Sequence, residues 1–174
     1  MTQWAQIVAQ HGPIVWQTAL RLLANEPDAA DCFQETFLSA MHVAARQPIA
    51  NWPGLLQRLA TTRALDILRK RILARSRHDH EPDFTSLAGP SPQPPDQLQN
   101  DELADHLATA LAHLPPLQAQ TYCLRHLNDF SYDQIAQELG ISVDNVGVNL
   151  HRARSRLREL LHPVSLNLMN RGES

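Results

Sequence analysis

A proline-rich segment from Ser76 to Asn100 sets the strongest limit on how this chain can fold. Few of its residues are apolar, and its prolines are Pro82, Pro90, Pro92, Pro94 and Pro95. Such a segment can neither continue a helix nor build a hydrophobic core. A structured connection of this length is uncommon within one compact domain. The sequence therefore predicts a flexible linker over residues 76–100 between two separately folded halves.

Composition decides the fold class of the two halves. The chain has 174 residues, of which 43% are hydrophobic, so each half can form its own core. Aromatic residues (5%) and glycine (6 residues) are scarce, which favours helices over a sheet. We expect an all-α protein with small helical domains over residues 1–75 and 101–162 and a loose tail over 163–174.

Apolar residues at helical spacing predict three helices in the first half, or four if residues 4–10 form a short one. Pro13 suits the first turn of one helix. A second is expected over about residues 28–45, and a third begins at Trp52. The residues expected on their apolar faces are Ile14, Val15, Ala19, Leu22, Leu23, Phe33, Phe37, Leu38, Met41, Leu55, Leu56, Leu59, Leu65 and Leu68.

In the second half, an amphipathic stripe over residues 103–114 stops at two prolines, which open a helix over residues 116–127. Ser131 and Gln134 then form a capping-box pattern for a short helix that ends at Gly140. Ser142 caps a last helix, which is expected to end near Leu161 before Pro163.

The last two predicted helices have the spacing of a helix-turn-helix. Ala136 lets the helices approach, and Gly140 supplies a positive φ in the turn. A plain helical hairpin shares the apolar spacing but does not need this alanine, glycine and cap together. The second helix of such a motif enters the DNA major groove. The candidate DNA-facing residues are Ser142, Val143, Asp144, Asn145, Gly147, Val148, Asn149 and Arg152.

The net charge is −3, but the basic residues are not evenly spread. The third predicted helix ends in a cationic run, with further arginines upstream. Since Leu65 and Leu68 face the core, we expect these cations mostly on the surface, where they could contact phosphates. A solvated helix end explains them equally well. The residues concerned are Arg58, Arg63, Arg69, Lys70, Arg71 and Arg75.

Taken together, the two halves resemble the extracytoplasmic-function (ECF) group of bacterial sigma factors. The run DCFQETFL at residues 31–38 is similar to the family's helix that binds core RNA polymerase, and RLATTRALDILRKR at 58–71 is similar to its promoter-melting helix. The segments LPPLQAQTYCLRHLNDFSYDQIAQELGISV and LHRARSRLREL are similar to the domain that reads the minus-thirty-five element.

This resemblance implies a role for each matching residue. It assigns polymerase binding to Asp31, Gln34, Glu35 and Leu38, which also share one helical edge at spacings of three and four. It assigns contacts with the minus-ten element to Arg58, Thr61, Thr62, Arg63, Arg69, Lys70 and Arg71. The implied partners are core RNA polymerase and promoter DNA, and an anti-sigma protein is a common partner in this family.

The chain also departs from the family pattern. Gly147 and Asn149 replace two usual cations of the recognition helix, and Thr61 and Thr62 stand where Arg-Asn is common. Loss of two phosphate contacts lowers the salt dependence of DNA binding by roughly two units of log-log slope. An alternative is therefore a sigma-like regulator that binds polymerase or another protein and reads DNA weakly.

An enzyme is the weakest reading, because the nine histidines form no recognised catalytic motif. Cys32 and Cys123 lack metal-binding spacing, so we expect reduced, partly buried thiols, no metal and no cofactor. No apolar run approaches the length of a membrane span, and the first residues lack a secretory pattern. We expect a cytoplasmic protein without membrane insertion.

Overall fold

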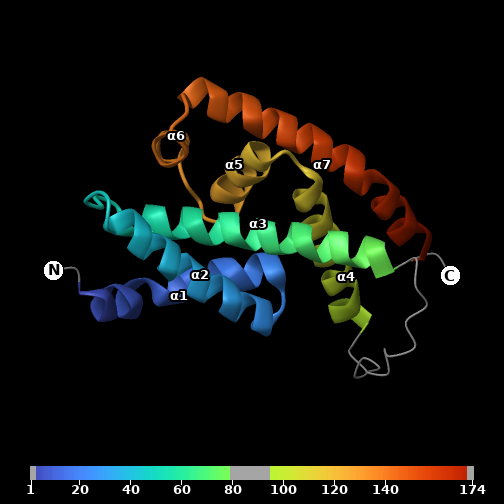
Figure 1. Cartoon of the computed structure of the whole chain (residues 1–174). Helices are drawn as coiled ribbons and strands as arrows, with labels where there is room; N and C mark the ends of the chain where they lie inside the picture. Colours follow the sequence, from blue (N-terminus) through green and yellow to red (C-terminus); the bar gives the residue numbers. More distant parts are fainter. Residues whose placement is uncertain (1–2, 79–94, 172–174) are drawn as a thin grey trace.

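The computed structural model describes residues 3–78 and 95–171, and within these ranges every regular element is a helix. The all-α prediction is confirmed. The helices, shown in Figure 1, are α1 (Trp4–Leu23), α2 (Glu26–Ala44), α3 (Trp52–His78), α4 (Pro95–His113), α5 (Pro116–His126), α6 (Tyr132–Leu139) and α7 (Val143–Arg171).

Helices α1, α2 and α3 pack on one another in the first half. One apolar cluster there is built on Val15, Phe37, Ala40, Leu56 and Ala60. The predicted apolar face of α2 is wrong at its C-terminal end, because Leu38 and Met41 are 51% and 44% exposed. These two side chains point away from α1 and α3, so α2 presents apolar surface to solvent.

The first helix is longer than the sequence predicts. Pro13 was expected to open it, but α1 runs unbroken from Trp4 with Pro13 inside. Proline inside a helix removes one backbone hydrogen bond. The turns before Pro13 pack on α3, where the ring of Trp4 meets that of Trp52 edge-on with their centroids 5.4 Å apart. The N-terminal turns of α1 are thus held by tertiary contacts that local sequence signals do not report.

The helix-turn-helix is present as predicted. Ser131 and Gln134 exchange both hydrogen bonds of a capping box at the start of α6. Gly140 ends this helix with φ 64°, a left-handed conformation that glycine adopts without steric cost. The core between α5, α6 and α7 contains fully buried Leu124, Ile135, Val146 and Leu150 and the nearly buried Phe130.

Three predicted boundaries are wrong. Helix α3 extends to His78 and α4 begins at Pro95, so both helices enter the predicted linker. Pro95 is tolerated because a first-turn N–H has no partner within a helix. Helix α7 continues past Pro163 to Arg171, where a loose tail was expected. Pro163 removes one hydrogen bond on an exposed helix, and water can satisfy the freed carbonyl.

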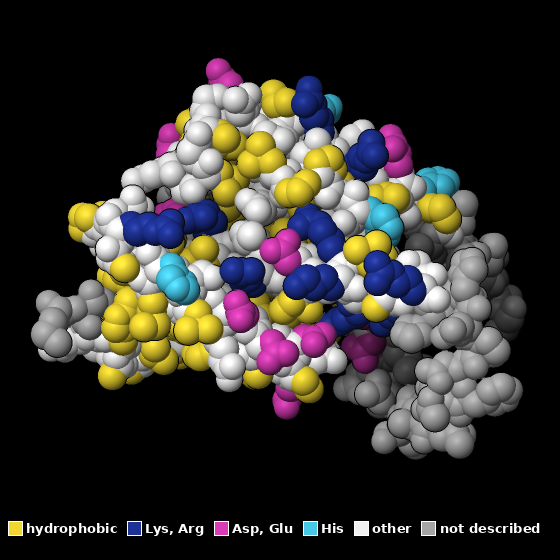
Figure 2. Space-filling model, viewed as in Figure 1, with side chains coloured by type: hydrophobic (Ala, Val, Ile, Leu, Met, Phe, Trp, Pro, Cys, Tyr) yellow, Lys and Arg dark blue, Asp and Glu magenta, His cyan; other side chains and the backbone are white. Residues whose placement is uncertain are grey.

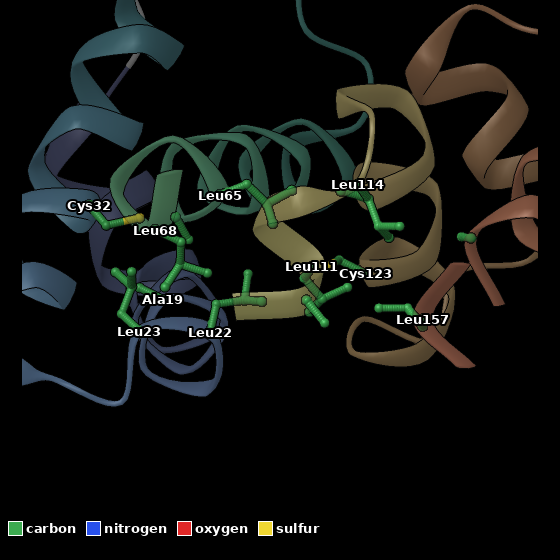
Figure 3. Packing of buried hydrophobic residues seen from close by; sticks show 14 of the residues in the cluster. Ala19, Leu22, Leu23, Cys32, Leu65, Leu68, Leu111, Leu114, Cys123 and Leu157 are labelled. Atoms are coloured by element: carbon green, nitrogen blue, oxygen red, sulfur yellow. The ribbon is translucent and has the colours of Figure 1, made fainter. Parts of the chain in front are cut away.

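The two halves are packed together. Helix α3 lies through the middle of the molecule, with α1 and α2 below it in the view of Figure 1, α5 and α6 above it, and α4 crossing it. A single apolar cluster joins them, and Figure 3 shows Leu65 and Leu68 between residues of both halves. Its buried members are Ala19, Leu22, Leu23, Ala29, Cys32, Ala64, Leu65, Leu68, Ala110, Leu111, Leu114, Ala119, Cys123, Ala153 and Leu157.

Candidate functional site

The candidate polymerase-binding residues lie on the outer face of α2. Asp31, Gln34, Glu35 and Leu38 are all exposed to solvent. Their spacing places them on one edge of the helix, next to the exposed Met41. The edge therefore combines acidic, amide and apolar groups without steric obstruction from the described part of the chain.

This edge continues into a groove of about 440 Å³ between α2 and α3. The α2 side is mainly acidic, while α3 adds two cations and one further acid. Candidate polymerase-binding and DNA-binding residues thus line one surface. The lining residues are Asp28, Asp31, Gln34, Glu35, Arg63, Asp66, Ile67 and Lys70.

Three cations of α3 form ion pairs within the protein. The Arg58 Nε lies 3.5 Å from Glu138 Oε2 of α6, and Arg69 Nη1 lies 3.3 Å from Asp66 Oδ1. Arg71 pairs with Asp28 of α2. Figure 2 shows basic side chains along α3 with acidic ones beside them. The expected free cationic surface is therefore wrong for these three arginines, because both halves supply acids along α3.

Three further α3 cations were candidates: Arg75 is exposed, and the other two, Arg63 and Lys70, line the groove between α2 and α3. Arg63 is half-buried and donates a hydrogen bond to Ser39 Oγ at 3.2 Å. Lys70 is exposed on the groove between α2 and α3. These two residues remain available to an anionic partner.

The two threonines of the predicted promoter-melting helix do not face solvent equally. Thr61 is fully buried and donates to Asn128 Oδ1 at 3.4 Å. Asn128 also donates to Thr18 Oγ1 of α1 at 3.0 Å. Thr62 is half-buried and donates to the Arg58 carbonyl at 2.9 Å. In this arrangement Thr61 cannot contact DNA, contrary to the expectation.

Glu138 of the helix-turn-helix contacts the N-terminal end of α3. Asn51 Oδ1 accepts from the Gly54 N–H at 3.1 Å, and Asn51 Nδ2 donates to Glu138 Oε1 at 3.2 Å. A Cβ at Gly54 would lie 2.3 Å from that Glu138 oxygen. The missing side chain at Gly54 therefore permits this approach. Sequence reasoning missed it because the partners are 87 residues apart.

The recognition surface of α7 is exposed. Asp144, Asn145, Val148 and Arg152 face solvent, as does the cap residue Ser142, whose Oγ accepts from the Asn145 N–H at 3.2 Å. Most of this predicted set is thus placed together on one accessible surface.

Asn149 is less free than the pattern suggests. Its Nδ2 donates to the Asn145 carbonyl at 2.8 Å, within α7. Gly147 leaves space beside it, since a Cβ there would meet only Tyr132 Cε2, at 3.9 Å. Residues 147–149 of the recognition helix therefore offer one partly engaged amide and no cation.

A second cationic cluster beside the helix-turn-helix was missed by sequence reasoning. Arg154 Nη2 lies 3.3 Å from His126 Nε2, and the Arg125 guanidinium lies 5.6 Å from the centre of the Tyr132 ring. Burial lowers the pKa of His126, and the charges of Arg154 and Arg125 lower it further. His126 is therefore neutral at pH 7, and its ring can accept a hydrogen bond from Arg154.

Neither cysteine has an environment suited to reactivity. Both are buried, and desolvation raises the pKa of Cys32 to about 11 and that of Cys123 to about 12. Over residues 3–78 and 95–171, no group of three or more His, Cys, Asp or Glu could hold a metal ion. Among the same residues, no helix combines the length and apolar character needed to cross a membrane.

Comparison with known proteins gives a consistent result. A family model described as "Sigma-70 region 2" matches residues 7–72, and one described as "Sigma-70, region 4" matches residues 105–157. The chain is 32% identical over 162 residues to the ECF RNA polymerase sigma factor SigE of Mycolicibacterium smegmatis. That match covers 92% of this chain and 62% of SigE.

Two further proteins resemble most of the chain. RNA polymerase sigma factor CarQ of Myxococcus xanthus is 30% identical over 164 residues, which cover 93% of this chain and 91% of CarQ. The solved structure of CnrH in complex with the cytosolic domain of CnrY has a TM-score of 0.55 and 25% identity, and the match covers 92% of this chain and 88% of that one. The chain belongs to the extracytoplasmic-function group of RNA polymerase sigma factors.

Proposed function

We propose that this chain directs RNA polymerase to specific promoters and initiates transcription, acting in the cytoplasm without a cofactor. Residues 1–75 would bind core polymerase and open the minus-ten element, and residues 101–162 would read the minus-thirty-five element. Residues 76–100 would link these domains, and residues 163–174 would form a C-terminal extension. The observation that supports this best is the match of both family models in order along the chain, the first of which includes the exposed edge of α2.

The chemistry of the α2 edge suits a protein partner. Charged and amide groups at Asp31, Gln34 and Glu35 can set orientation, while the exposed Leu38 and Met41 offer apolar area for burial. Such a combination is typical of a protein–protein interface, in which a polar rim surrounds apolar anchors. We assign this edge to core polymerase.

The direct test is reconstitution of the full chain with bacterial core RNA polymerase. Co-elution, promoter-dependent transcripts and sequencing of the bound DNA would together support the function. The double substitution Gln34→Ala with Glu35→Ala should weaken core binding at least tenfold. Glu159→Ala, which removes an exposed charge of α7, should leave core binding unchanged. Wild-type protein that fails to bind core polymerase would overturn the proposal.

A second candidate function is a sigma-like regulator that binds polymerase but reads DNA weakly. Its support is the lack of cations around Gly147 and the internal hydrogen bond of Asn149. Core binding without promoter-dependent transcripts would favour this alternative. Transcripts from defined start sites would exclude it.

We further propose that an anti-sigma protein binds this chain. The family resemblance supports this partner, and the solved structure of CnrH contains the cytosolic domain of CnrY. Co-purification from the source cells, with and without Leu38→Asp on the exposed α2 edge, would test whether an inhibitor and polymerase share that edge.

A further inference from the structure

Three basic side chains gather beside the helix-turn-helix, and we call Arg125, His126 and Arg154 the basic cluster. Arg125 and His126 lie at the C-terminal end of α5, and Arg154 lies on α7. The Nη2 atom of Arg154 is 3.3 Å from the Nε2 atom of His126. His126 and Arg154 are exposed, and Arg125 is half-buried. The cluster is therefore open to a ligand from solvent.

Positive charge and aromatic rings surround His126. Its ring lies against that of Tyr122, with their centroids 4.5 Å apart. The Arg125 guanidinium lies 5.6 Å from the centre of the Tyr132 ring of α6, and Arg125 also donates to the Phe130 carbonyl at 2.8 Å. In the part of the chain that the structure describes, neither arginine of the cluster forms an ion pair with a carboxylate. Their charges are thus left for an anionic ligand.

These charges keep His126 neutral in the free chain. Burial lowers the pKa of His126, and the charges of Arg154 and Arg125 lower it further. A second proton on the ring would place an N–H group opposite the Arg154 guanidinium, which is unfavourable. An anion between the two groups reverses this balance, because it accepts hydrogen bonds from both.

The basic cluster lies where the backbone of a bound duplex is expected. In a helix-turn-helix, the first helix crosses the DNA backbone while the second enters the major groove. Tyr132 is the first residue of α6, and a Cβ at Gly147 of the recognition helix would lie 3.9 Å from its ring. Tyr132 therefore joins the recognition surface of α7 to Arg125 and the rest of the cluster.

We propose that Arg125, His126 and Arg154 bind one backbone phosphate of duplex DNA, and that His126 takes up a proton from solvent when the phosphate binds. The choice of duplex DNA as the ligand rests on the proposed function. No bond of the DNA changes. The protonated ring donates its Nε2 hydrogen to a phosphate oxygen beside the donors of Arg154. The cluster thereby supplies cations that the recognition helix lacks at Gly147 and Asn149.

Proton uptake makes the duplex affinity depend on pH. A bound phosphate raises the pKa of His126 above its value in the free chain. The affinity is therefore greatest below the free pKa, and the gain is lost as pH rises through the bound pKa. Since the free pKa lies below the ordinary value of 6.5, the change falls within about pH 5 to 8. Uptake of one proton limits the change to about tenfold per pH unit.

The test uses the full chain and a fluorescent 20-base-pair duplex of mixed sequence, with anisotropy followed from pH 5.5 to pH 8 at constant low ionic strength. Wild type should gain about threefold to tenfold more affinity toward low pH than His126→Gln, which cannot take up the proton. The matched control is His42→Gln, which removes an exposed histidine of α2 and should keep the wild-type profile. Arg154→Gln should weaken binding and lower the salt slope by about one.

NMR titration of the His126 ring separates two sources of the same ligand chemistry. Its resonance is assigned by its loss in His126→Gln. Duplex DNA should raise the pKa of His126 strongly, and sulfate, used as a free anion of phosphate shape, should raise it less. A rise with sulfate alone would overturn the assignment to DNA. Equal pH profiles for wild type and His126→Gln, with an unchanged His126 pKa in the duplex complex, would overturn the proposal altogether.

Failure of this proposal is distinguishable from failure of the proposed function. Core binding and promoter-dependent transcripts measure the function, and neither readout requires proton uptake by His126. Promoter-dependent transcripts from a chain whose duplex affinity has no His126-dependent pH profile would count against the phosphate site alone. A His126-dependent profile in a chain that fails to bind core polymerase would count against the proposed function alone.

Discussion

Helix α3 and the recognition helix α7 differ both in positive charge and in accessibility to solvent. Helix α3 is rich in cations, but Arg58, Arg69 and Arg71 are paired with acids. The recognition part of α7 is open to solvent, but its DNA-facing surface offers Arg152 as the cation from the predicted set. Accessibility and charge are therefore separated between the two surfaces.

The largest expected effect concerns the apolar residue shared by both halves. Leu65 is fully buried in the joint cluster, so Leu65→Ala should cost about 2–5 kcal/mol of unfolding free energy. All three tryptophans lie in the first half, whereas helices of both halves contribute to circular dichroism. Urea transitions followed by tryptophan fluorescence and by circular dichroism should coincide. Two separate transitions would show that the halves are independent.

The second prediction tests whether α7 contacts DNA at all. Arg152→Ala should weaken binding to duplex promoter DNA about tenfold and reduce the salt slope of log K by about one. Arg156→Ala, further along the same helix, is the matched control. Equal losses for both variants would indicate diffuse charge attraction in place of a defined recognition surface.

The third prediction concerns the two buried thiols, Cys32 in α2 and Cys123 in α5, and their effect on stability at high pH. Because the folded pKa values of Cys32 and Cys123 are raised, the unfolded thiols ionise first as pH rises. Their contribution to stability is complete below the unfolded pKa near 8.5 and falls as pH approaches about 11 to 12. The loss should reach at most about 1.4 kcal/mol per pH unit for each thiol.

Unfolding free energies between pH 8 and 10 would measure this effect, and Cys123→Ala and Cys32→Ala should each flatten the alkaline decline. A decline that survives both substitutions would mean that other groups cause it.

The smallest expected effect comes from adding a cation to the recognition helix α7. Gly147→Lys has space beside Tyr132 and should stabilise α7 by up to about 1 kcal/mol through helix propensity. It should also raise duplex affinity and increase the salt slope by about one. Thermal melting and anisotropy titrations would measure both. Greater stability without tighter DNA binding would place this part of α7 away from the DNA.

The parts of the molecule that the sequence predicts well are those whose signals are local. The capping box of Ser131 and Gln134, the left-handed Gly140 and the core residue Ile135 lie within ten residues of one another. Each constrains the same short stretch of backbone, so they predict one structure together. The exposed edge of α2 was predictable for the same reason, because helical spacing alone defines it.

The contact of the first half with the second could not be predicted, because the residues that meet there are distant along the chain. Thr61 and Asn128 are 67 residues apart, and Thr18 and Asn128 are 110 apart. Leu65 and Leu68 were correctly expected to be buried, but periodicity does not tell which neighbour buries them. The errors at Pro13 and Pro163 have a related cause, since a proline signals a helix end only when surrounding contacts do not support the helix.

The shared position of α3 also affects how the chain is made. Synthesis proceeds at roughly 5–20 residues per second, and domains generally fold as they leave the ribosome, N-terminal part first. Helices α1 to α3 are therefore complete before the residues that cover Ala64, Leu65 and Leu68 have been translated. Translation of residues 79–157 takes about 4 to 16 s at that rate. During this interval the apolar surface of α3 lacks its cover from the second half. We expect chaperones to bind this surface until the C-terminal half has been made.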